Sequence, residues 1–142
     1  MDEIRINGIK IFGHHGDLPE EVRLGQMFKV SLVLGLDTGR AAEADDLSLT
    51  VDYAAVIRRV EDVVHGPSVR LVETLAERVA AAVLGGFPLV QTVSVEVGKP
   101  FAPLASFFEE VSVRIFRERT RKPASRQKAS QEKTRPVHSW ER

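Results

Sequence analysis

The fold class follows from one stretch of the chain, FKVSLVLGLD at residues 28–37. Large apolar side chains occupy every second position from Phe28 to Leu36, and mostly smaller or polar residues lie between them. This period of two is typical of a strand in an antiparallel sheet with one buried face. Residues 28–37 are therefore predicted to form a half-buried strand.

Three further segments show a similar alternation. Isoleucines recur in residues 4–11, and β-branched residues alternate in residues 93–97 and 111–115. Asn7-Gly8 interrupts the first of these segments and is expected to form a β-bulge. The chain is thus predicted to contain four strands.

Two helical patterns lie between the strand pairs. The first has its apolar stripe over residues 56–64, behind an N-cap at Thr50 or Asp52. The second is expected over residues 69–84, with Ser68 as its N-cap and a glycine pair as its stop. The resulting order, ββααββ, predicts an α+β domain in which a four-stranded antiparallel sheet carries both helices on one face.

The second face of this sheet is expected to be semi-polar. Such a face suits subunit packing or a wet barrel interior better than a dry core, so self-association is predicted. The side chains expected there include Lys29, Ser31, Val33, Gly35, Ser112, Arg114 and Phe116.

Length and charge divide the chain into a domain and a tail. The 142 residues are 43% hydrophobic and 28% charged, the balance of one globular domain with a modest surplus. Residues 120–142 lack apolar periodicity and hold seven basic against two acidic residues, so a basic, disordered tail is expected. Because the whole chain is neutral, the domain at residues 1–119 carries a net charge of −5.

The same counts exclude several classes of function. A mildly acidic domain argues against nucleic-acid binding, which needs a clustered basic surface. The absence of cysteine excludes a thiolate nucleophile and a cysteine zinc site. No apolar run approaches the ~20 residues of a membrane span, and the charged N-terminus does not resemble a signal peptide. A cytoplasmic protein without membrane contact is expected.

Paired histidines mark the turn after the first strand, in GHHG at residues 13–16. They invite a metal interpretation, but the other two histidines, His65 and His138, stand at no spacing that completes a three-ligand site. We therefore predict no metal and expect His14 and His15 to hold the turn.

Three more residues combine acid–base chemistry with a defined position. Tyr53 starts the first helix, where packing is the ordinary role of a lone tyrosine. Glu73 lies in the first turn of the second helix, where the helix dipole alone explains a carboxylate, although repulsion from Glu77 would favour a cationic or amidine-like partner. Lys99 ends a strand before Pro100, a position at which most lysines are simply solvated.

Five segments follow one another along the chain at defined spacings. They are IFGHHG at 11–16, Glu21 ahead of LGQ at 24–26, DD at 45–46 with TVDY at 50–53, LVETLAE at 71–77 and VEVGKP at 95–100. Taken in order, these segments resemble the dihydroneopterin aldolase family of the folate pathway. The resemblance spans residues 1–119 and implies the T-fold (tunnelling fold), whose ββααββ subunits join their sheets around a ring into a β-barrel. It further implies a homo-octamer of two stacked rings with active sites between subunits.

The resemblance also implies the reaction of a carbon–carbon lyase. The family cleaves 7,8-dihydroneopterin by a retro-aldol reaction into 6-hydroxymethyl-7,8-dihydropterin and glycolaldehyde. Other aldolases accept the electrons of the broken bond with a lysine Schiff base or a zinc ion. In this family the cyclic imine of the pterin substrate accepts these electrons, so no cofactor, metal or Schiff base is expected.

Five residues take roles from the family by position. Lys99 matches the acid/base lysine, and Tyr53 matches the tyrosine that moves hydroxyl and enamine protons from the neighbouring subunit. Glu21 matches the acid that positions Lys99 and the substrate hydroxyls. Glu73 matches the acid that binds the 2-amino and ring N–H edge of the pterin. The backbone at Val72, where relatives often carry leucine, binds the same ring.

Two alternatives remain at this stage. A dihydroneopterin (triphosphate) epimerase would run the same retro-aldol step partly backwards, with Arg23 and Arg70 as modest candidates for binding a triphosphate. A non-catalytic oligomeric T-fold protein would bind acidic partners through its basic tail, and the retained acid–base residues argue against it.

Overall fold

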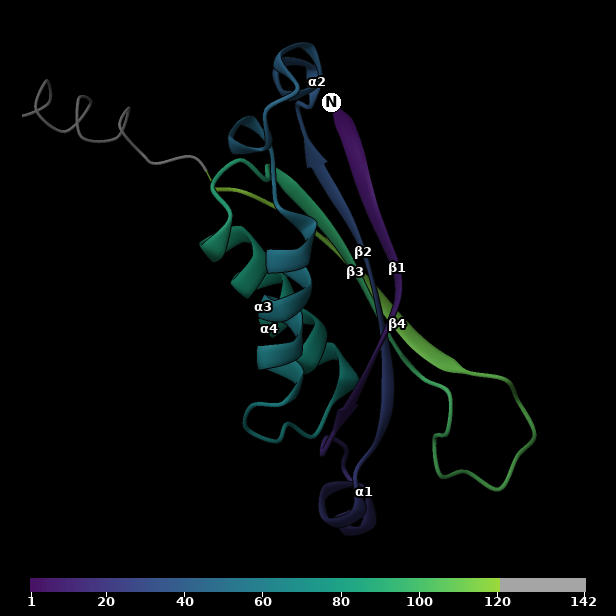
Figure 1. Cartoon of the computed structure of the whole chain (residues 1–142). Helices are drawn as coiled ribbons and strands as arrows, with labels where there is room; N and C mark the ends of the chain where they lie inside the picture. Colours follow the sequence, from purple (N-terminus) through teal and green to yellow (C-terminus); the bar gives the residue numbers. More distant parts are fainter. Residues whose placement is uncertain (121–142) are drawn as a thin grey trace, which may run out of the picture.

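The alternating stretch at residues 28–37, apart from its last residue Asp37, lies in the second strand of a four-stranded antiparallel sheet with the order β1-β2-β3-β4 (Figure 1). The computed structural model describes residues 1–120, so the predicted tail lies outside the described residues from position 121 onward. A register shift between Ile6 and Ile9 confirms the predicted bulge at Asn7-Gly8. The strands are β1 (Asp2–Gly13), β2 (Gln26–Leu36), β3 (Thr92–Lys99) and β4 (Val111–Glu118).

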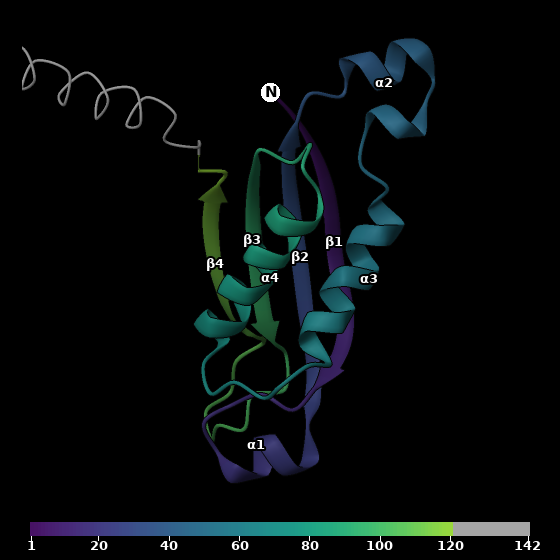
Figure 2. The same ribbon diagram turned by 90° about the vertical axis from the view of Figure 1, so that its left-hand side faces the viewer.

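Two long helices, α3 (Tyr53–Val64) and α4 (Val72–Gly86), cover one face of the sheet, as predicted (Figure 2). Of the two proposed caps for α3, Asp52 is the one used, since its carboxylate accepts a hydrogen bond from Ala54 N at 3.0 Å. The prediction that α4 begins at Val69 behind Ser68 is wrong. Its N-cap is Leu71, because the backbone of Val69 is already bonded to the loop after β1.

Three short helices were not predicted: α1 (Pro19–Leu24), α2 (Gly39–Ala44) and the 3₁₀ turn η1 (Leu47–Leu49). One or two turns are too short to show an apolar stripe with a period of 3.6. They lie in the β1–β2 and β2–α3 connections, so the order of the principal elements remains ββααββ.

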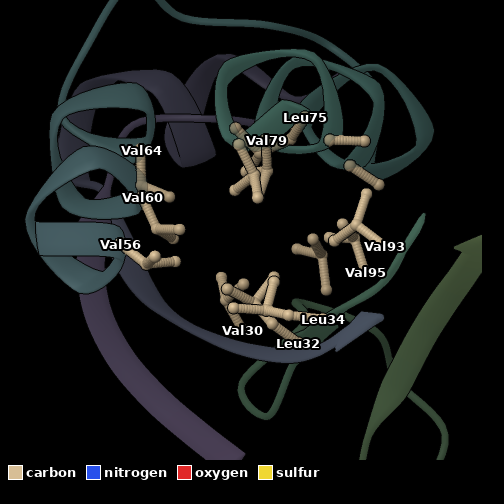
Figure 3. Close-up of a cluster of buried hydrophobic side chains, with 14 of the residues drawn as sticks. Val30, Leu32, Leu34, Val56, Val60, Val64, Leu75, Val79, Val93 and Val95 are labelled. Atoms are coloured by element: carbon tan, nitrogen blue, oxygen red, sulfur yellow. The ribbon is translucent and has the colours of Figure 1, made fainter. Parts of the chain in front are cut away.

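The core lies between the sheet and the two long helices (Figure 3). Every alternate residue of β2 from Phe28 to Leu36 is buried, which confirms the face predicted from the alternation. Burying one such side chain contributes about 1.5–3 kcal/mol. Side chains labelled in this core are Val30, Leu32, Leu34, Val56, Val60, Val64, Leu75, Val79, Val93 and Val95.

The opposite face is semi-polar, as the sequence predicts. It contains a hollow of about 150 Å³ lined by residues of all four strands, among them Arg5, Ser31, Glu96 and Arg114. Along the sheet, β1 and β4 are the two edge strands. None of the helices in residues 1–120 combines the length and apolar character needed to cross a membrane.

Candidate active site

One end of the sheet gathers the chemically distinctive segments. There β1 leads into the GHHG turn and α1, and β3 leads into the long connection to β4 (Figures 1 and 2). A hydrogen bond from Gly16 N to Val69 O, at 2.9 Å, ties the turn to the segment that precedes α4. Three connections distant in sequence therefore meet at this end.

An ion pair between Glu21 and Lys99 is the centre of this region. Lys99 Nζ lies 2.7 Å from Glu21 Oε2, although 78 residues separate the two in sequence. Their side chains are only 13% and 6% exposed, so Lys99 is not the solvated lysine that its position alone would suggest. A buried carboxylate of this kind needs its cation, because leaving either charge unpaired is strongly unfavourable.

Gly16 makes room for the carboxylate. Its φ of +147° is rarely adopted by residues with a side chain, and a Cβ there would overlap the carboxylate of Glu21. The second glycine of the GHHG turn is thus required by the position of Glu21. The turn motif and the acid in α1 belong to one local structure.

Glu21 is held ionised by its partners. Burial alone would raise the pKa of this carboxyl, but hydrogen bonds from Lys99, Gln26 and the backbone of Leu18 outweigh it and leave the pKa lowered. Gln26 donates from Nε2 at 2.8 Å, while its Oε1 is buried and has no hydrogen-bond partner within residues 1–120. The sequence marks Gln26 only as part of the LGQ segment and assigns it no role, although its fixed spacing from Glu21 was the available signal.

A hollow of about 130 Å³ opens beside the ion pair. Its walls come from α1 and the start of β2, including Glu21 and Gln26, and from Phe101 and Pro103 of the β3–β4 connection. The acid of the buried pair, Glu21, therefore borders a space that a small molecule or water can enter, while Lys99 lies behind it.

His14 and His15 brace the turn, as expected. His15 is buried, and its Nε2 donates to Val64 O at 2.6 Å while its Nδ1 accepts from Val69 N at 3.1 Å. Desolvation lowers the pKa of His15 despite its bond to Val64, so this ring is neutral. His14 is exposed and bonds Val22 O at 2.9 Å. Within residues 1–120, no group of three or more metal-ligating side chains is assembled.

Glu73 and Val72 start α4 at the same end of the domain. Val72 is buried. The side chain of Glu73 is exposed, and its carboxylate accepts no hydrogen bond from residues 1–120. Repulsion between Glu73 and Glu77 on this helix predicted a cationic partner for these carboxylates. Glu77 has such a partner in Arg117. A hollow of about 480 Å³, a size typical of small-molecule sites, lies beside the start of α4. Its lining includes Leu71 and Thr74 but not Glu73.

Tyr53 lies at the other end of the domain. It is the first residue of α3 and is 62% exposed, so it does not have the packing role of a lone tyrosine within this chain. The last residue of α3, Val64, is the one bonded to His15. At 1.5 Å per residue, the twelve-residue helix places the two ends about 17 Å apart. The chain therefore brings Glu21, Lys99 and Glu73 to one end and leaves Tyr53 away from them.

Comparisons with known proteins agree on one family. The family model described as dihydroneopterin aldolase matches residues 4–116. The dihydroneopterin aldolase of Streptomyces coelicolor is 49% identical over 119 residues, which cover 84% of this chain and 99% of that protein. That of Bacillus subtilis is 42% identical over 120 residues, covering 84% and 100%.

A solved structure supports the same conclusion. The crystal structure of E. coli dihydroneopterin aldolase in complex with neopterin matches with a TM-score of 0.76 at 28% identity, covering 82% of this chain and 99% of that one. Fold and geometry thus define a ββααββ domain with a buried acid–base pair at the end of its sheet. The chain belongs to the dihydroneopterin aldolase family.

Proposed function

We propose that this protein is a lyase that cleaves 7,8-dihydroneopterin into 6-hydroxymethyl-7,8-dihydropterin and glycolaldehyde. Family membership and the named relatives support the aldolase activity. The observation that carries the proposal is the buried Glu21–Lys99 pair beside a hollow. Such a pair supplies a positioned proton donor at a site partly shielded from water.

The chemistry needs proton transfer and an electron sink. A base takes the proton of the side-chain hydroxyl, the adjacent C–C bond breaks, and its electron pair moves into the ring imine to form an enamine as glycolaldehyde leaves. A proton returned to the exocyclic enamine carbon restores the imine and gives the hydroxymethyl product. Because the substrate holds the electrons itself, the protein needs only to bind, orient and move protons.

Lys99 is the proposed acid/base group, acting through water near the ring imine. Its ammonium is oriented by Glu21, which Gln26 and the backbone of Leu18 hold in turn. Glu21 also lines the hollow and is the proposed acceptor of hydrogen bonds from the substrate hydroxyls. The ion pair therefore links substrate binding to the proton donor.

Glu73 is the proposed binding residue for the pterin edge. Its exposed carboxylate has no partner among residues 1–120, and two parallel N–H donors of a pterin match its two oxygens. The backbone of Val72, at the first residue of α4, offers a further hydrogen bond to the same ring. These contacts exist in both the substrate and the transition state, so they contribute to affinity.

Tyr53 is proposed to act in the site of a neighbouring copy. Its distance from Lys99 within one chain prevents the two from acting on one substrate molecule. Co-expression of Lys99→Ala chains with Tyr53→Phe chains tests this, because some sites then combine an intact Lys99 with an intact Tyr53. Activity well above that of either variant alone is expected, and its absence would contradict a shared site.

The corresponding assembly is a closed ring. The edge strands β1 and β4 leave backbone groups free to pair with further copies, and the semi-polar face would line the barrel. We propose a homo-octamer of two stacked rings, located in the cytoplasm. Light scattering at micromolar concentration is expected to give eight times the mass of the chain, and a stable monomer would contradict the shared site.

Product analysis tests the reaction itself. Dihydroneopterin and its triphosphate are incubated with the enzyme, and the products are separated by chromatography. Hydroxymethyldihydropterin with stoichiometric glycolaldehyde is the expected outcome. Inversion at the 2′ carbon as the main reaction would show an epimerase, and no conversion of either compound would leave only a binding protein.

A further inference from the structure

The connection between β3 and β4 is held at both of its ends by ion pairs. We propose that Lys29 and Glu110 are positioning residues that hold residues 100–109 against the hollow beside the Glu21–Lys99 pair. The inference rests on the proposed function, because one of its readouts is the turnover of dihydroneopterin.

The Lys29–Glu110 pair is better shielded than an ordinary surface ion pair. Lys29 Nζ lies 2.7 Å from Glu110 Oε2, and the two side chains are 39% and 24% exposed. For comparison, the Arg70 and Asp17 side chains of the pair near α4 are 83% and 65% exposed. The hydrogen bond from Lys29 to Glu110 raises the pKa of the lysine, so its ammonium stays charged at neutral pH.

Gly98 accommodates this contact. It is the β3 partner of Lys29 in the sheet, and a Cβ on Gly98 would overlap the carboxylate of Glu110. The carboxylate therefore lies directly over the backbone of β3, one residue before Lys99. Successive strand residues point to opposite faces, so Lys99 reaches Glu21 on one face while Glu110 reaches Lys29 on the other.

Within residues 1–120, few other hydrogen bonds hold residues 100–109. Among the hydrogen bonds of the described chain, this segment contributes one, from Leu104 N to Ala102 O at 2.9 Å. Phe101, Leu104 and Phe107 are largely exposed. Phe101 and Pro103 nevertheless line the hollow beside Glu21. Loss of the Lys29–Glu110 pair would release one end of the segment and with it part of the wall of the site.

Turnover and proteolysis of matched variants test the inference. Glu110→Gln removes the charge with little change of shape, and Glu109→Gln makes the same change at the adjacent exposed residue. For Glu110→Gln we expect KM for dihydroneopterin to rise about 3- to 10-fold with kcat within about twofold, the signature of lost binding rather than lost chemistry. Chymotrypsin should also cut within residues 101–108 several times faster in Glu110→Gln than in wild type. Mass spectrometry identifies the cut sites.

Charge exchange provides a second test. Lys29→Glu should reproduce the effects of Glu110→Gln, and combining Lys29→Glu with Glu110→Lys should restore KM and protease resistance. Unchanged KM and cleavage in Glu110→Gln would overturn the inference, as would an equal rise of KM in Glu109→Gln. Wild-type enzyme that does not cleave dihydroneopterin would overturn the proposed function instead, and the chymotrypsin comparison would still decide whether the ion pair holds the segment.

Discussion

His15 and Glu21 are both buried polar residues of the connection between β1 and β2, yet their partners differ. Both ring nitrogens of His15 bond main-chain groups, Val64 O and Val69 N. Glu21 accepts one hydrogen bond from the backbone, at Leu18, but its other two partners are the side chains of Lys99 and Gln26, and it lines a hollow. A buried group saturated by the backbone stabilises the fold, whereas one paired with an ionisable side chain beside a hollow can exchange partners when a ligand enters.

Substitution of Lys99 should produce the largest effect. It tests whether the Glu21–Lys99 pair, unlike His15, serves the reaction. We expect Lys99→Ala to lower kcat by about 10²–10⁴ because the proton donor is lost, while affinity for the product changes much less. Single-turnover rates and the Kd of hydroxymethyldihydropterin measure the two effects.

Lys99→Arg is the matched control for folding. It keeps the charge next to Glu21, but the pKa of a guanidinium is too high for efficient proton transfer. Its thermal stability should therefore be close to wild type while kcat remains low. Turnover of Lys99→Ala at the wild-type rate would remove Lys99 from the chemistry.

Glu73 adds an exposed carboxylate to the comparison. Glu73→Ala should weaken pterin binding by about 30- to 1,000-fold, since a charge-assisted bidentate contact of roughly 2–4 kcal/mol is lost. The control is Glu77→Ala on the same helix, whose carboxylate is already paired with Arg117. Titration calorimetry with hydroxymethyldihydropterin should find near-normal affinity for Glu77→Ala, and equal affinities of both variants would disprove the role of Glu73.

Because His15 bonds only backbone groups, its substitution should change stability rather than activity. His15→Ala leaves a buried carbonyl and a buried N–H without partners, so we expect a loss of about 2–3 kcal/mol in unfolding free energy. His14→Ala, at the exposed neighbour, should cost less than about 1 kcal/mol. Urea unfolding at fixed protein concentration measures both. A His15→Ala enzyme that keeps its stability but loses kcat would reverse the assignment.

His15 and Glu21 should also make the unfolding free energy depend on pH, each in its own pH range. This is the smallest of the expected effects. Because the pKa of folded His15 lies below its ordinary value of 6.5, the unfolded state binds the proton first and the stabilisation is lost as pH falls below that value. Glu21 contributes in the same direction, but only below its ordinary value of 4.5. Unfolding free energy between pH 7 and 5 should therefore decline less in His15→Gln than in wild type. An identical decline in both proteins would exclude His15 as its source.

Much of the fold was predictable from local patterns. The alternation in β2 identified the buried face, and the interruption at Asn7-Gly8 marked the bulge. The α4 start was mispredicted because Val69 bonds to a loop more than fifty residues earlier, a contact that local propensity does not report. The short helix α1 was missed for lack of a periodic stripe, although it carries Glu21.

The site was predictable only in its residue types. Their positions in the chain identified Glu21, Lys99, Glu73 and Tyr53 by resemblance to a family. These positions did not predict how the four side chains are arranged in space. Gln26 belongs to the LGQ segment that resembles the family, but its hydrogen bond to Glu21 could not be predicted, because it depends on how β2 begins next to α1. The roles of these residues in the reaction stay predictions until the variants are measured.

By itself, the sequence determined which faces are buried, because burial follows the period of the apolar side chains. It also placed Tyr53, Glu73 and Lys99 near the ends of predicted elements. Only the tertiary structure decided that Glu21 and Lys99 form a buried pair and that His15 bonds the backbone. It likewise showed that the start of α3, where Tyr53 lies, is at the opposite end of the domain from this pair. These outcomes depend on how distant segments pack, and side-chain pairing across 78 residues leaves no trace in local periodicity.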